Sequence, residues 1–177
     1  RSVRQKIRVR TYLVSGLTFL EIKRKNNKGR TSKKRLEVPR ECFEDLRQCP
    51  EAGPYLDKYA AYALGDIAPA CTTEFRRITL VNAGKTERLT VDFGLSFANR
   101  RTGCAAALPG LVVIELKQDG RITSEMKGIL LDHRIKPFRI SKYCIGTILT
   151  APQVRPGRFK EKKRYIDKII LQNSIKP

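Results

Sequence analysis

The stretch QKIRVRTYLVSGLTFLEIKRK, residues 5–25, decides the fold expected for this chain. In its first part Ile7 and Val9 alternate with basic residues, and in its last part Leu20 and Ile22 alternate with charged ones. Alternation with a period of two places apolar side chains on one face of a β-strand and ionic side chains on the other. The stretch therefore predicts two strands of an antiparallel sheet that has one apolar and one ionic face.

The same alternation recurs further along the chain, in FRRITL at 75–80, ERLTVDF at 87–93 and LVVIELK at 111–117. Turn-forming residues at 26–29 and 82–85 mark chain reversals, and the second turn joins its neighbouring strands as a hairpin. Helices are predicted over 123–135, over 141–150 with Ser141 as N-cap, and over 159–171. The pattern predicts an α+β fold.

Positive charge dominates the composition but is unevenly distributed. The 177 residues include 37 Lys and Arg against 17 Asp and Glu, a formal charge of +20. Residues 1–40 hold 14 basic and 2 acidic side chains, whereas residues 41–74 hold 2 and 7. We therefore expect a single domain, residues 1–177, that binds anions. We also expect an acidic helical insertion at 41–74, with its helix over YLDKYAAYALG at 55–65.

Several classes of protein do not fit the composition. No apolar run is long enough to span a bilayer, and no secretory leader is visible, so we expect a protein without a transmembrane segment. The five cysteines are odd in number and form no C-x-x-C pair, which favours free thiols in the cytoplasm over a zinc site. The chain starts with Arg and almost inside a strand pattern, so we expect further sequence before it.

The ionic faces of the five predicted strands carry more positive charge than a solvated surface needs. They hold eight cations, three carboxylates and two threonines. Like charges that face each other across strands destabilise a sheet, and an anionic ligand would relieve this repulsion. Solvation by water is the alternative interpretation. Aromatic residues are only 7% and Trp is absent, so phosphate oxygens suit these faces better than bases do, and nucleic acid is not the expected partner.

The segments KIRVRTY, FLEIKRK, FRRITL, ERLTVDF, VVIELK and ISKYCIG follow one another in an order that resembles a known family. They resemble the VTC (vacuolar transporter chaperone) domain, the polyphosphate polymerase branch of the triphosphate tunnel metalloenzyme superfamily. The resemblance extends from Arg8 to Tyr143. It implies an antiparallel β-barrel tunnel with a basic lumen, flanked by helices. It also implies that the family's first strands have no counterpart in this chain.

The resemblance assigns roles to individual residues. Phosphate-binding and catalytic cations are implied at Arg8, Arg10, Lys23, Arg77, Arg88 and Lys142. Ser141 is implied to bind phosphate together with Lys142, and its position at a helix start also suits an ordinary N-cap. Phe75 stands where the family prefers Tyr. Glu115 is implied to bind Mn²⁺ or Mg²⁺, and on the residues alone a salt bridge to a neighbouring arginine is equally compatible.

The activity that the resemblance implies is a metal-dependent polyphosphate polymerase-like phosphotransferase. Such an enzyme moves the terminal phosphate of ATP, triphosphate or polyphosphate onto a growing polyphosphate chain. An inorganic triphosphatase of the same fold is one alternative, and a non-catalytic polyphosphate- or RNA-binding module is another. Glu115 favours an enzyme over a binding module, because a carboxylate beside a phosphate chain repels it unless a divalent cation lies between them.

Overall fold

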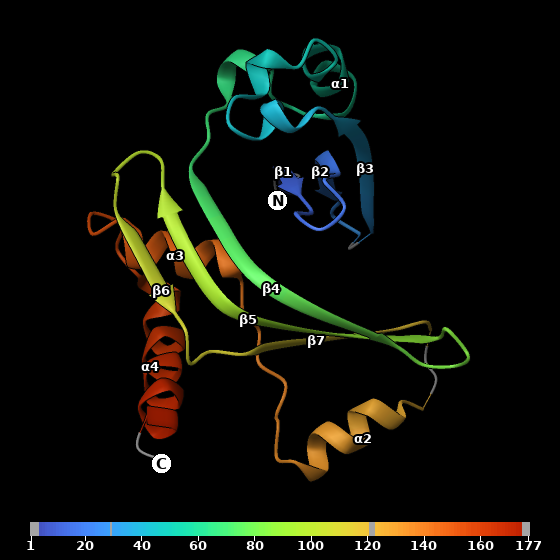
Figure 1. Ribbon diagram of the computed structural model, residues 1–177, viewed down its shortest axis with the longest axis vertical. Coiled ribbons are helices and arrows are strands. Elements are labelled where there is room, and N and C mark those ends of the chain that lie inside the picture. Colours follow the sequence, from blue (N-terminus) through green and yellow to red (C-terminus); the bar gives the residue numbers. More distant parts are fainter. Residues whose placement is uncertain (1–3, 29, 121–122, 175–177) are drawn as a thin grey trace. The chain divides into compact units, whose positions relative to one another are not determined.

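The computed structural model describes residues 4–28, 30–120 and 123–174, and it divides the chain into two compact units (Figure 1). The first unit is Arg1–Pro69 and the second is Ala70–Pro177. Each unit has its own antiparallel sheet and its own hydrophobic core. The two units are therefore described one at a time.

The first unit is a three-stranded sheet covered by helices on one face. Its strands β1 (Arg4–Thr11), β2 (Thr18–Lys25) and β3 (Thr31–Val38) pair in that order. The core includes Leu20 and Ile22 from β2, packed with Cys42 and Leu56 from the helical segments. Those segments are the 3-10 helices η1 (Arg40–Phe43), η2 (Leu46–Gln48) and η3 (Leu64–Asp66) and the helix α1 (Ala52–Tyr59). The predicted alternation in β1 and β2 is confirmed, and its apolar side forms the core.

The helix expected at 55–65 is wrong in its bounds. It starts earlier, at Ala52, because Ala52 is fully buried and Pro54 falls in the first turn, where a proline is tolerated. It ends at Tyr59, where Ala60 becomes extended. Residues 60–67 then continue over the core, with Leu64 and Ile67 packed against it. Half of segment 41–74 is helical, and the segment also includes the start of the next strand.

The second unit is built on a long central strand, β5 (Glu87–Asn99). On one side it pairs with β4 (Cys71–Val81), and the turn between them confirms the predicted hairpin. On the other side, β7 (Val113–Gln118) pairs with the first half of β5 and β6 (Ala105–Leu108) with the second half (Figure 1). Lys85 adopts a positive φ of 55° in the hairpin turn, and the Asn82 side chain accepts a hydrogen bond from the Glu87 amide at 2.9 Å.

Helices cover the second half of this sheet. Leu95 and Phe97 of β5 pack with Ile145 of α3 (Lys142–Thr150) and Ile166 of α4 (Lys160–Ser174). The three C-terminal helices predicted from the sequence are confirmed, the first being α2 (Glu125–Asp132). Within the residues that the structure describes, no helix combines the length and apolar character needed to cross a membrane.

A β-bulge in β5 determines which side chains share a face. Arg76 lies opposite Phe93 and Glu74 lies opposite Ser96, so one residue of β4 faces two of β5. Gly94 is one of these two residues and has a φ of +62°, a conformation that favours glycine. As a result, Asp92 and Phe97 lie on the same face of the sheet although they are five positions apart.

The described strands form one open sheet in each unit, and no closed barrel occurs among them. The mixed α+β class and the antiparallel pairing are confirmed. The barrel tunnel and the single domain over 1–177 stay predictions.

Candidate functional site

The ionic face of the β1–β2–β3 sheet brings basic side chains from three strands together. We call it the cationic face, and it consists of Arg4, Lys6, Arg8, Arg10, Lys23, Lys25, Lys33 and Arg35. It lies on the side of the sheet opposite the helices, because the alternating residues of the same strands form the core. The predicted site residues Arg8, Arg10 and Lys23 all belong to it.

One buried carboxylate organises the middle of the cationic face. Glu21 is opposite Arg8 on β1 and Arg35 on β3, and only 2% of its side chain is exposed. Its Oε2 accepts a hydrogen bond from Arg8 Nε at 2.6 Å, and its Oε1 lies 2.5 Å from Lys33 Nζ. Burial alone would raise the pKa of Glu21, but Lys33 and Arg8 lower it to about 2. Glu21 is therefore ionised at neutral pH and holds these cations in fixed positions.

Next to Glu21, a row of lysines crosses the sheet. Lys6 is directly opposite Lys23, and Lys23 is directly opposite Lys33. Neighbouring strands are about 4.8 Å apart, so the three ammonium groups start from closely spaced backbone positions. Such a row of like charges destabilises the sheet, and a bound polyanion would offset the repulsion. The row therefore places three like charges on directly opposed positions of neighbouring strands.

A second buried carboxylate, Asp92, organises the cations of the second unit. Its side chain is fully buried and bound by Arg77 of β4 through Nε at 2.5 Å and Nη2 at 2.7 Å. Lys142 of α3 contacts the same carboxylate, with Nζ 2.5 Å from Oδ2. Burial raises the pKa of Asp92, but Arg77 and Lys142 outweigh this effect and hold it below its ordinary value. Two cations are thus fixed around one anion, and the group keeps a net positive charge.

Phe75 and Ser141 support this cluster. The Phe75 ring centre is 5.2 Å from the Arg77 guanidinium and 4.8 Å from the Lys142 ammonium, so the aromatic face contacts both cations. Ser141 is the N-cap of α3, and its hydroxyl accepts a hydrogen bond from the Cys144 amide at 3.4 Å. The N-cap prediction is confirmed, and the role of Ser141 in phosphate binding stays a prediction.

Arg88 and Glu115 lie on the same face as Asp92, nearer the hairpin turn. Arg88 is opposite Lys117 of β7, and Glu115 is opposite Thr90. Glu115 is half exposed, and its Oε1 is 3.4 Å from Lys117 Nζ. Glu115 therefore does form a salt bridge, but its partner is Lys117 and not the arginine considered from the sequence. No cluster of three or more His, Cys, Asp or Glu that could hold a metal occurs in the described part of the chain.

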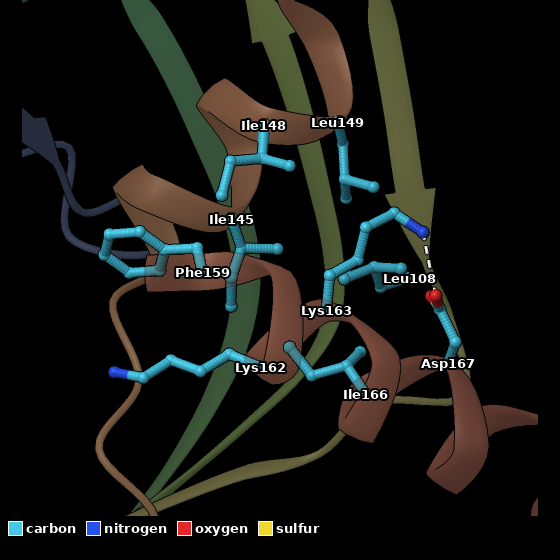
Figure 2. A pocket seen from close by; sticks show the side chains of 9 residues that line it. All are labelled: Leu108, Ile145, Ile148, Leu149, Phe159, Lys162, Lys163, Ile166 and Asp167. Carbon is cyan, nitrogen blue, oxygen red and sulfur yellow. Dashed lines mark hydrogen bonds and ion pairs between the residues drawn. The ribbon is translucent and has the colours of Figure 1, made fainter. Parts of the chain in front are cut away.

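A small cavity beneath α4 is unrelated to these cations. It measures about 20 Å³, and its walls are mainly apolar side chains of α3, α4 and β6. Figure 2 shows Lys163 paired with Asp167 at its margin, while the ammonium of Lys162 points away. The space suits about one water molecule, whereas ligand pockets measure roughly 300–1,000 Å³. The cavity is therefore a packing gap of about the size of one water molecule.

Sequence reasoning missed two members of the cationic face, Lys33 and Arg35. Both lie on β3, a strand that the sequence analysis did not predict. The segment TSKKRLEV has basic residues at successive positions, so its alternation is hidden. One signal is available in the sequence. Leu36 and Val38 stand at even-numbered positions, whereas Lys33 and Arg35 stand at odd-numbered ones, so the two pairs would lie on opposite faces of a strand.

The predicted site residues fall into two sets, one in each unit. Arg8, Arg10 and Lys23 belong to the first unit. The second unit holds Arg77, Arg88, Glu115, Ser141 and Lys142. Their convergence in one tunnel stays a prediction.

Comparison with known proteins gives one match. The family model described as VTC domain matches residues 1–150, which is most of the chain. No curated protein matches, and no solved structure matches. The matched range includes every predicted site residue from Arg8 to Lys142.

Proposed function

Because the chain belongs to the VTC domain family, we propose that it is a polyphosphate polymerase-like phosphotransferase. Membership of this family indicates a polyphosphate-related function. The finer proposal is that the chain moves the terminal phosphate of ATP, triphosphate or polyphosphate onto a growing polyphosphate chain. The five free thiols suit a cytoplasmic location, which is part of the proposal.

The observation that carries the proposal is the cationic face with its row of lysines. Arg8 offers a planar guanidinium that can bind two phosphate oxygens, and Lys23 offers a compact charge between two other ammonium groups. A chain of phosphates has anionic oxygens at regular intervals and can contact several such cations at once. A single carboxylate or monophosphate is shorter and spans fewer of them. The arrangement therefore supports a linear polyanion as the ligand.

Glu115 is the residue that we propose binds Mn²⁺ or Mg²⁺. Its carboxylate is half exposed and contacts Lys117 at 3.4 Å, so its oxygens can reach a cation. Mg²⁺ is commonly held by one or two carboxylates together with phosphates and water, and one carboxylate on a phosphate-binding face fits this pattern. When bound, the metal would neutralise charge on the transferring phosphate.

Transfer between phosphates requires mainly positioning and charge stabilisation. The attacking phosphate oxygen is already ionised, so no side chain has to remove a proton from it. Arg77 and Lys142 are held by Asp92, which reduces the reorganisation needed when charge develops on the phosphate oxygens. We propose that Arg88 and Ser141 contribute further phosphate contacts.

The test is to incubate the chain with ATP and Mn²⁺ and to measure both polyphosphate on a gel and released phosphate. Glu115→Gln should abolish metal-dependent turnover and leave triphosphate affinity in EDTA unchanged or slightly higher, since one repulsive charge is removed. Glu74→Gln is the matched control, because Glu74 is exposed on β4 on the other face of the sheet. This variant should keep normal turnover.

Each outcome separates the proposal from its alternatives. Release of phosphate without formation of polyphosphate would identify the chain as a triphosphatase and not a polymerase. Triphosphate binding without turnover would identify a non-catalytic binding module. Near-normal turnover of Glu115→Gln would show that Glu115 is not the metal ligand.

A further inference from the structure

The connection between β1 and β2 exposes apolar side chains that nothing in its own unit covers. Leu13 is 78% exposed and Val14 is fully exposed, while Tyr12 and Leu17 are partly exposed beside them. Scattered apolar residues are common on surfaces, but these four lie within a single six-residue connection, Tyr12–Leu17. We call this connection the apolar tip. The turn itself needs only Gly16, which has a φ of +69°.

The apolar tip has a defined shape. The Tyr12 amide donates a hydrogen bond to the Leu17 carbonyl at 2.8 Å, which closes the connection across its base. The hydroxyls of Thr11 and Thr18 are 2.9 Å apart one step further into the strands. The Tyr12 ring meets Phe19 edge-on, with 6.1 Å between ring centres. These contacts fix the end of the hairpin, where Leu13 and Val14 are exposed to solvent.

Two arginines flank the base of the apolar tip. The Arg35 guanidinium is 3.4 Å from the Phe19 ring centre and 5.9 Å from the Tyr12 ring centre. Arg10 lies over Tyr12 at 5.6 Å and donates a hydrogen bond to its hydroxyl at 3.1 Å. The order along the hairpin is therefore an apolar end, then an aromatic ring, then guanidinium groups. A membrane interface has the matching order of acyl chains, an interfacial layer rich in Tyr and Trp, and phosphate headgroups.

We propose that the apolar tip contacts an anionic membrane surface. Leu13 and Val14 insert into the boundary between headgroups and acyl chains, and Arg10 and Arg35 face lipid phosphates. A lipid surface fits better than a protein groove, because Val14 is fully exposed and the guanidinium groups of Arg10 and Arg35 both lie against the aromatic rings at the base. The proposal does not depend on the phosphotransferase activity.

The chain has no Trp, so a single introduced Trp reports its own surroundings without background. Val14→Trp should show a blue shift of its emission when vesicles of phosphatidylcholine and phosphatidylserine are added. Vesicles of phosphatidylcholine alone should produce a much smaller shift. Leu171→Trp is the matched control, because Leu171 is 62% exposed on α4 and outside the apolar tip. Its emission should not change.

Flotation of the unlabelled chain with the same vesicles gives the affinity. The double variant Leu13→Asp with Val14→Asp should bind phosphatidylserine vesicles at least about tenfold more weakly, since the apolar burial is lost and negative charge is added. Leu171→Asp should bind as the unchanged chain does. Triphosphate affinity should be equal in all three proteins, which shows that the fold and the cationic face are intact.

Three results would overturn the proposal. Undiminished vesicle binding by the double variant would assign membrane binding to the cationic face alone. If the double variant no longer binds triphosphate, the apolar tip belongs to the phosphate site and is not a separate membrane contact. Failure of the unchanged chain to float with either kind of vesicle would exclude lipid and leave a protein as the partner of the apolar tip.

Discussion

At the scale of single residues, two buried carboxylates set the geometry of the basic side chains. Glu21 fixes Arg8 and Lys33, and Asp92 fixes Arg77 and Lys142. In both cases the carboxylate is buried and its partners are partly exposed, so the cations can still reach a ligand.

Glu21 predicts a specific loss of stability in acid. Its pKa is about 2 in the folded chain, against an ordinary value of 4.5, so folding favours the ionised form. The resulting stabilisation is complete above about pH 4.5 and is lost as the pH falls through about 2. It amounts to at most about 3 kcal/mol. Urea denaturation from pH 6 to pH 2 should therefore show a shallower pH dependence for Glu21→Gln than for the unchanged chain. An identical dependence in both would contradict the assignment.

Removing Asp92 should destabilise the second unit. Asp92→Ala leaves Arg77 and Lys142 close together without their shared anion, which we expect to cost about 1–3 kcal/mol. The value lies below that of a fully buried pair because both cations keep some access to water. Chemical denaturation measures it. The exposed Asp57 on α1 gives the control Asp57→Ala, which should change stability by less than about 0.5 kcal/mol.

At the scale of secondary-structure elements, α3 approaches β5 closely because one of its residues is glycine. A Cβ added at Gly146 would lie 2.5 Å from Phe97 Cδ1 and 3.1 Å from Cys71 Sγ. These distances are too short for carbon and sulfur atoms, so the helix would have to move away from the sheet. The position therefore requires glycine despite its weak helix propensity.

Gly146→Ala should lower the free energy of unfolding by about 1–3 kcal/mol, because overpacking outweighs the gain in helix propensity. The matched control is Gly128→Ala in α2, where an added Cβ meets nothing within 4 Å. That variant should be neutral or more stable by up to about 1 kcal/mol. Thermal and urea unfolding of both variants test the pair. A stabilising Gly146→Ala would mean that α3 does not pack on Phe97 as described.

The elements that the sequence could predict are those with a strong local signal. Ile7, Val9, Leu20 and Ile22 alternate cleanly, and Ser141 marks the start of α3. β3 and β6 lack such a signal, because TSKKRLEV is mostly basic and AAAL has no polar positions. The bulge at Gly94 could not be predicted from the sequence either, because it arises from the register in which β5 pairs with β4. For the same reason Arg77 and Lys142 could be named from the sequence, whereas their shared contact with Asp92 and the membership of Lys33 and Arg35 in the cationic face could not.

At the scale of the whole molecule, the net charge of +20 predicts strong stabilisation by a polyanion. Triphosphate at about 100 times its dissociation constant should add roughly 2.7 kcal/mol to the free energy of unfolding. At matched ionic strength it should raise the melting temperature well above the effect of monophosphate. Lys23→Ala should reduce the shift, and Lys168→Ala on α4 is the control. An equal response to chloride would indicate nonspecific screening.

The two cores predict that destabilisation stays local to a unit. Leu56 is fully buried in the first core and Leu95 in the second. Leu56→Ala and Leu95→Ala should each cost about 2–5 kcal/mol in their own unit. Hydrogen exchange followed by mass spectrometry should show faster exchange in β2 for the first variant and in β5 for the second. Equal acceleration over the whole chain in both variants would show that the units unfold together.

The bulge at Gly94 also limits how this strand can change over evolutionary time. Asp92 shares a face with Leu95 and Phe97 only because one extra residue separates them. Deletion of that one residue would move the side chains of one half of the strand to the opposite face of the sheet. Either the apolar side chains would leave the helices or Asp92 would leave its two cations. Deletions and insertions at this point are therefore far more damaging than most substitutions, and sequence alignments of the strand should show a fixed length between these residues.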